Sequence, residues 1–203
     1  MSTLELYRDD GPLARALAPL GRAAPPSALA TLAVVPVLVL ALATGADGSR
    51  GLLAAAVAWV VLLGGASRGG ALERDRFRWA VPPLLRAGEY TLILWMSAAG
   101  CADGPGAGFA LLLALAFRHY DLVYRLRYRG RTPPAWLGAV AGGWDGRLVA
   151  IWVLLAADAL PAGLYVLAAV LGVLFAAESA ASWRSFDAGD RPALYDEGEG
   201  EAE

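Results

Sequence analysis

Long runs of apolar residues, separated by short polar segments, fill most of the chain between residues 27 and 182. At about 1.5 Å of helix rise per residue, a run of about 20 residues crosses a hydrocarbon core about 30 Å thick. The pattern therefore predicts an all-α, polytopic membrane bundle. Six transmembrane helices are expected, at residues 27–44, 51–67, 79–101, 108–129, 148–160 and 162–180. The second and the fifth are at the short end of the length range for such helices.

The residues before the first apolar run show an amphipathic pattern. Leu13, Leu17 and Leu20 recur at helical spacing and share one face. Asp10 and Pro12 are typical of a helix start, with Asp10 as the N-cap and Pro12 in the first turn. We expect an interfacial helix that lies under the bilayer.

The chain thus divides into three regions. An N-terminal segment with the interfacial helix precedes the six-helix transmembrane domain, and an acidic tail that we expect to be disordered follows it. Both end regions are expected on the cytoplasmic side. The three regions cover residues 1–26, 27–182 and 183–203.

The composition agrees with a membrane protein. Hydrophobic residues make up 58% of the chain and charged residues only 18%, and the mean hydropathy is +0.50. A net charge of −2 gives no reason to expect a nucleic-acid partner. Cys101 is the only cysteine, which excludes an intrachain disulfide and a thiolate metal cluster. The basic residues are all arginine, which suggests a GC-rich bacterial genome.

The arginines also predict the orientation. They gather before the first run, between the second and third, between the fourth and fifth, and after the sixth, all on one side of a six-span protein. The opposite connections hold Asp47, Asp103 and Asp158, with Arg50 as their only cation. Because basic residues favour the cytoplasmic side, we expect a multi-pass plasma-membrane protein with both termini in the cytoplasm.

One apolar run contains an ionisable pair. Arg86 and Glu89 are three residues apart, so they lie on the same face of a helix. An unpaired charge inside a bilayer costs several kcal/mol, and ionisable residues there commonly mark functional sites. The pair is therefore the first candidate for a binding site.

A second group of polar residues follows in the fourth run. Arg118, Asp121 and Arg125 lie on one stripe of the predicted helix, and His119, the only histidine, is beside them. For the stripe beyond Arg125, arginines and tyrosines at the head-group level are an ordinary alternative. Arg118, His119 and Asp121 lie nearer the hydrocarbon and are candidates for function.

The fifth run opens with the segment 143–147, which contains Asp145 and Arg147. Asp145 either caps that helix or faces Arg86 or Arg118 across the bundle, and both interpretations stay open. Arginines that converge at the ends of several spans suit a phosphate or pyrophosphate, because guanidinium groups bind such oxyanions through two parallel hydrogen bonds.

Three motifs, RAGEY at 86–90, FRHYDLVYR at 117–125 and GWDGR at 143–147, together resemble an actinobacterial membrane domain of unknown function. In that family the domain often shares a polypeptide with CDP-alcohol phosphatidyltransferase or nucleotidyltransferase modules. The resemblance implies a membrane setting and a phospholipid pathway, and it implies no particular reaction.

The architecture also resembles the CDP-alcohol phosphatidyltransferases, which carry the motif D-x2-D-G-x2-A-R-x8-G-x3-D-x3-D. In that family the four aspartates hold the divalent metals that bind the CDP pyrophosphate. With Gly65 as the first motif glycine, the aspartate positions hold Val61, Gly64, Pro82 and Arg86. None of these four residues has a carboxylate, and Mg²⁺ and Mn²⁺ need oxygen ligands of that kind. We therefore predict no metal or other cofactor, and we leave catalytic residues unassigned.

The sequence therefore predicts a non-catalytic or degenerate module of the phosphatidyltransferase type that binds an anionic phospholipid or a nucleotide-linked head group. In it, Arg86 would neutralise the phosphate where those enzymes use metal. The expected partners are membrane lipid and either a phospholipid-synthesis enzyme or a second copy of the chain. The predicted anion site comprises Arg86, Glu89, Arg118, His119, Asp121, Arg125, Asp145 and Arg147.

Two alternatives stay open. An active phosphotransferase would use Mg²⁺ or Mn²⁺ on a rearranged carboxylate set of Glu89, Asp121 and Asp145, with Asp75 as a fourth member. A small transporter of lipids or phosphometabolites would use the prolines within or beside the spans as hinges. No inverted repeat is detectable to support transport.

Overall fold

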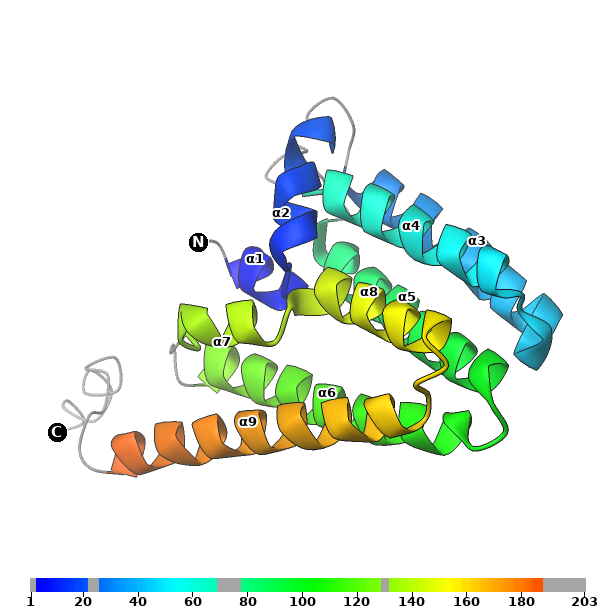
Figure 1. Ribbon diagram of the computed structural model, residues 1–203. Coiled ribbons are helices and arrows are strands. Elements are labelled where there is room, and N and C mark those ends of the chain that lie inside the picture. Colours follow the sequence, from blue (N-terminus) through cyan, green and yellow to red (C-terminus); the bar gives the residue numbers. More distant parts are fainter. Residues whose placement is uncertain (1–2, 22–25, 69–77, 129–131, 188–203) are drawn as a thin grey trace, which may run out of the picture.

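The computed structural model describes residues 3–21, 26–68, 78–128 and 132–187 (Figure 1). All regular elements in these ranges are helical. The short elements are α1 (Thr3–Arg8), α2 (Pro12–Leu17), η1 (Ala18–Gly21), η2 (Gly45–Asp47), η4 (Arg78–Ala80) and α7 (Ala135–Val140). The long helices are α3 (Pro26–Thr44), α4 (Arg50–Ala66), α5 (Val81–Gly100), α6 (Gly104–Tyr128), α8 (Gly143–Ala156) and α9 (Ala162–Asp187).

The long helices form one bundle, and α1, α2 and α7 gather at one end of it, which we term the polar end (Figure 1). Helix α5 packs against α3, α6 and α8, whereas α9 packs mainly along α6. Successive long helices alternate in direction, so the polar end receives the starts of α3, α5 and α8 and the ends of α4, α6 and α9.

Local chemistry accounts for several helix boundaries. The Ser49 side chain accepts a 3.2 Å hydrogen bond from the Leu52 amide and caps α4. Pro82 lies in the first turn of α5, where the missing N–H costs nothing. The helix of the fifth apolar run starts at Gly143, five residues before the predicted 148, and α9 continues to Asp187, beyond the predicted 180.

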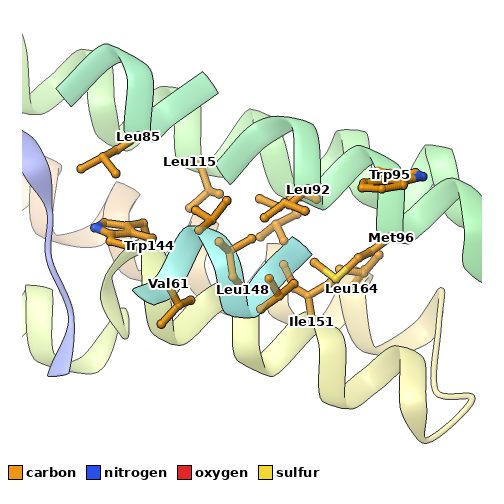
Figure 2. Packing of buried hydrophobic residues seen from close by; sticks show 14 of the residues in the cluster. Val61, Leu85, Leu92, Trp95, Met96, Leu115, Trp144, Leu148, Ile151 and Leu164 are labelled. Atoms are coloured by element: carbon orange, nitrogen blue, oxygen red, sulfur yellow. The ribbon is translucent and has the colours of Figure 1, made fainter. Parts of the chain in front are cut away.

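The core lies around α8. The side chains of Trp144, Leu148 and Ile151 lie between apolar side chains of α4, α5, α6 and α9 (Figure 2). Gly64 of α4 permits this approach, because a Cβ there would lie 2.8 Å from the Trp144 ring. Trp144, Leu148 and Ile151 are fully buried, so α8 lies at the centre of the bundle.

The outer surface of the bundle is apolar as well. Large side chains such as Leu42, Val166 and Val173 are more than 60% exposed on the long helices. In the described residues, three helical stretches are long and apolar enough to cross a membrane, at Gly104–Arg127, Trp136–Ala156 and Ala162–Arg184. An apolar exterior on helices of this length is compatible with a membrane protein.

Candidate functional site

Two arginines and a glutamate form the centre of a buried ion cluster at the polar end. Arg147 of α8 donates through Nε to Glu89 Oε1 of α5 at 2.7 Å, and both side chains are at most 2% exposed. Arg86 donates to the other carboxylate oxygen of Glu89 at 3.1 Å. The Arg86 and Glu89 pair expected from their spacing is therefore present, and Arg147 joins it from a different helix.

Asp9 completes this cluster from the N-terminal segment. Its Oδ2 accepts a 3.0 Å hydrogen bond from Arg147 Nη2 and lies 3.9 Å from Arg86 Nη1. Burial alone would raise the pKa of Asp9, but Arg147, His119 and Arg86 together hold that pKa well below its usual range. We term Asp9, Arg86, Glu89, His119 and Arg147 the N-terminal ion cluster.

His119 lies at the edge of this cluster. Its Nδ1 is 2.6 Å from the Tyr90 hydroxyl, and its Nε2 is 3.9 Å from Asp9 Oδ2. If the Tyr90 hydroxyl donates to Nδ1, Nε2 carries the proton of the neutral ring and needs an acceptor. Within the described ranges, this buried Nε2 has no hydrogen-bond partner.

Asp10 is buried beside the cluster and makes contacts of its own. Its carboxylate accepts hydrogen bonds from Arg8 at 2.8 Å, from Arg68 at 2.7 Å and from the Trp144 indole at 2.8 Å. Burial opposes ionisation, and Arg8 with the other donors still lowers the pKa of Asp10. The predicted helix cap is therefore wrong, because the N-cap of α2 is Gly11 and Asp10 points into the bundle.

Asp145 holds the N-terminal segment from the opposite side. Its carboxylate accepts from the amides of Gly11, Leu13 and Ala14 at 2.6, 2.9 and 3.1 Å. Asp145 thus caps α2. Both interpretations from the sequence are therefore wrong, because Asp145 neither caps its own helix nor faces Arg86 or Arg118. Gly143 makes the contact possible, because its φ is +63° and a Cβ there would lie 2.1 Å from the Gly11 nitrogen.

A second group of charged residues connects α6 with α9. We term it the α6–α9 ion cluster, and it comprises Arg118, Asp121 and Arg125 of α6 and Glu178 of α9. Arg125 binds Glu178 through two hydrogen bonds of 2.7 and 2.9 Å and lies 2.7 Å from Asp121. Arg118 Nη1 is 3.9 Å from Glu178. The Arg125 side chain is only 3% exposed, so its guanidinium group is paired inside the bundle.

A pocket of about 500 Å³ adjoins this second cluster. Arg125 and Glu178 form its charged wall, and residues of α7 and α9 with the segment before α7 form the remainder. Its volume lies in the range of small-molecule sites, about 300–1,000 Å³. The other lining residues are Thr132, Pro134, Trp136, Leu174, Ala177, Ala181 and Ser182.

The carboxylates proposed for a rearranged metal set do not meet. Glu89 contacts arginines, Asp121 contacts Arg125 and Ser179, and Asp145 accepts from backbone amides. Asp75 lies outside the described residues. Among the residues that the structure does describe, no three His, Cys, Asp or Glu side chains are grouped so that they could hold a metal ion.

Sequence reasoning missed the roles of Asp9, Asp10 and Glu178. Asp10 was considered only as part of a helix start and Asp9 was not singled out, although the run of Arg8, Asp9 and Asp10 beside Gly11 was a signal of unusual charge density. Glu178 carries the only negative charge within the last apolar run and could have been found as a partner for α6.

No curated protein and no solved structure is detectably similar to this chain. One family model does match, and it covers residues 1–202, nearly the whole length of the sequence. The match includes the N-terminal segment together with all helices that contribute to the two ion clusters. The chain therefore belongs to the family of unknown function DUF5941.

Proposed function

We propose that this chain is a non-catalytic membrane module that binds the phosphate group of an anionic phospholipid or a nucleotide-linked head group at the N-terminal ion cluster. It acts beside enzymes of phospholipid synthesis, as the resemblance to phosphatidyltransferases implies. The six long helices span the plasma membrane, with the polar end and both termini in the cytoplasm. The alternating helix directions and the arginines at the polar end support this orientation.

The observation that carries the proposal is that the donors around Asp9 are only partly hydrogen-bonded to it. Arg86, Arg147 and His119 converge on its carboxylate, but only Arg147 is within hydrogen-bond distance of it. His119 Nε2 has no partner in the described part of the chain. A phosphate, with its tetrahedral set of oxygens, offers acceptors to several converging donors, and arginine is well suited to bind it.

The charge balance favours a phosphate as well. With Asp9 in place, two arginines face two carboxylates. If Asp9 withdraws, Arg86, Arg147 and Glu89 leave one net positive charge. That charge matches a phosphodiester, and the Nε2–H of a neutral His119 can donate to a further oxygen of a pyrophosphate.

Asp9 therefore acts as an internal anion that holds the site when no ligand is bound. Its backbone has φ of +52°, in the left-handed region, which aspartate adopts more often than most other non-glycine residues. For aspartate such a conformation costs about 1 kcal/mol. This strain lowers the free-energy cost of exchanging Asp9 for a ligand, while Asp10 and Asp145 keep the adjoining segment docked.

The direct test compares Asp9→Asn with Asp47→Asn, an exposed carboxylate at the opposite end of the bundle. Each purified variant is titrated with dioleoyl phosphatidylglycerol and, separately, with CDP, and binding is followed by native mass spectrometry. Because the amide removes the competing charge, we expect Asp9→Asn to bind one of these probes about tenfold more tightly. Asp47→Asn should match the parent protein, and the preferred probe distinguishes a lipid from a nucleotide head group.

A second pair of variants isolates His119. Asn places its amide near the position of Nδ1 and can keep the contact with Tyr90, whereas Gln reaches the position of Nε2. We expect His119→Asn to bind the same probe about tenfold more weakly and His119→Gln to bind nearly as the parent protein does. If Asp9→Asn folds and binds neither probe better than the parent protein, the proposal is wrong.

A further inference from the structure

The pocket beside the α6–α9 ion cluster is separate from the phosphate site. It lies between the last turns of α6, the segment that leads into α7, and α9. Its lining is charged at Arg125 and Glu178 and apolar at Trp136, Leu174 and Ala177. A pocket lined by both charged and apolar side chains suits an amphiphile.

The charge of the cluster limits the class of amphiphile. Arg118 and Arg125 face Asp121 and Glu178, so the four charges already balance. An anionic or cationic head group would add an uncompensated charge to a largely buried group, which is costly. The polar end of the ligand is therefore uncharged.

The hydrogen-bonding groups of the charged wall specify the chemistry further. Glu178 lines the pocket, and its side chain is 10% exposed. A carboxylate oxygen can accept more than one hydrogen bond. A hydroxyl group can therefore donate to Glu178 without changing the charge balance.

The surroundings place this pocket at the level of a membrane interface. Tyr124 of α6 stacks on Trp183 of α9 with ring centroids 6.1 Å apart, and Trp136 beside the pocket is 51% exposed. Tyrosine and tryptophan gather at the head-group level of bilayers. Leu174 and Ala177 continue the apolar wall along α9 in the direction of the hydrocarbon.

We propose that this pocket binds a neutral lipid whose polar end carries hydroxyl groups, with its acyl chain along α9. The inference shares the membrane setting with the proposed function but uses none of the residues of the phosphate site. The two proposals can therefore fail separately.

The test uses a monoacylglycerol probe with a diazirine in its acyl chain, added to the full chain in detergent micelles. After irradiation, peptide mass spectrometry locates the label. We expect labelling to concentrate on the peptides that contain Trp136 and Leu174, and monoolein in excess to suppress it. Oleoyl phosphate at the same concentration should suppress it at least tenfold less effectively.

Matched variants show whether the pocket itself is responsible. Ala177→Trp fills the pocket from an exposed position, so folding should be kept, and we expect at least fivefold less labelling. Val173→Trp adds the same ring to an exposed position of α9 that does not line the pocket, and should leave the labelling unchanged. Equal labelling in the two variants, or stronger competition by oleoyl phosphate, would overturn the inference. Asp9→Asn should not alter the labelling, whatever its effect on phosphate binding.

Discussion

The two ends of the bundle treat their charges in opposite ways. At the end away from the N-terminal segment, Arg50 pairs with Asp158, and these side chains are 56% and 74% exposed. At the polar end, Arg147 and Glu89 are 2% and 0% exposed and share several partners. Water already stabilises charges of the first kind, whereas charges of the second kind depend on each other. Among the described residues, the buried charged side chains lie at the polar end.

The comparison predicts its largest effect for Arg147→Met. The variant would leave Glu89 and Asp9 buried with one fewer cation, and loss of one partner of a buried pair typically costs about 3–5 kcal/mol. We expect a loss of stability of that size, measured by reversible unfolding in mixed micelles with increasing SDS. A loss below about 1 kcal/mol would mean that water reaches the cluster and that the two ends do not differ as described.

Asp145→Ala should have the next largest effect. It removes the acceptor of three amide groups at the start of α2, and loss of a helix N-terminal cap costs about 0.5–2 kcal/mol in all. Hydrogen exchange should accelerate at Gly11, Leu13 and Ala14. Ser49→Ala, which removes the exposed cap of α4, is the matched control and should leave exchange at these three amides unchanged.

The pH dependence of stability should also distinguish the two ends, because the buried carboxylates lie at the polar end. Asp9 and Asp10 have pKa values that are lower in the folded protein than in the unfolded chain. Their contribution to stability is therefore fully present above the unfolded pKa of about 3.9 and is lost as the pH falls below it toward the folded values. Thermal unfolding in detergent between pH 7 and pH 2 should show this loss. Asp9→Asn should have a shallower pH dependence, and an unchanged slope would contradict the assignment.

The smallest effect is expected for Arg50→Ala. An exposed ion pair contributes about 0–1 kcal/mol, so this variant should unfold within about 1 kcal/mol of the parent protein. The same mixed-micelle measurement checks it. A loss comparable to that of Arg147→Met would show that exposure does not explain the contrast between the two ends.

Much of the helical architecture could be predicted because it depends on local patterns. Apolar runs indicated the long helices, and the i, i+3 spacing indicated the pair of Arg86 and Glu89. The start of α8 was placed too late, because Trp144, Asp145 and Arg147 resemble a polar loop in sequence. Their polar atoms are satisfied by residues of the N-terminal segment and of α5, which no local pattern can indicate.

Periodicity and charge along the chain were sufficient to determine an apolar helical protein with its arginines gathered at one end, because hydrophobic burial and helix geometry act over a few residues. Only the tertiary structure decided which carboxylates distant in sequence the arginines bind. Asp9 is 138 positions from Arg147, and Glu178 is 53 positions from Arg125. The sequence pointed to Arg86 as an anion site, and the fold then placed the carboxylate of Asp9 there, because helix packing brings distant charges together and buried charges must be paired.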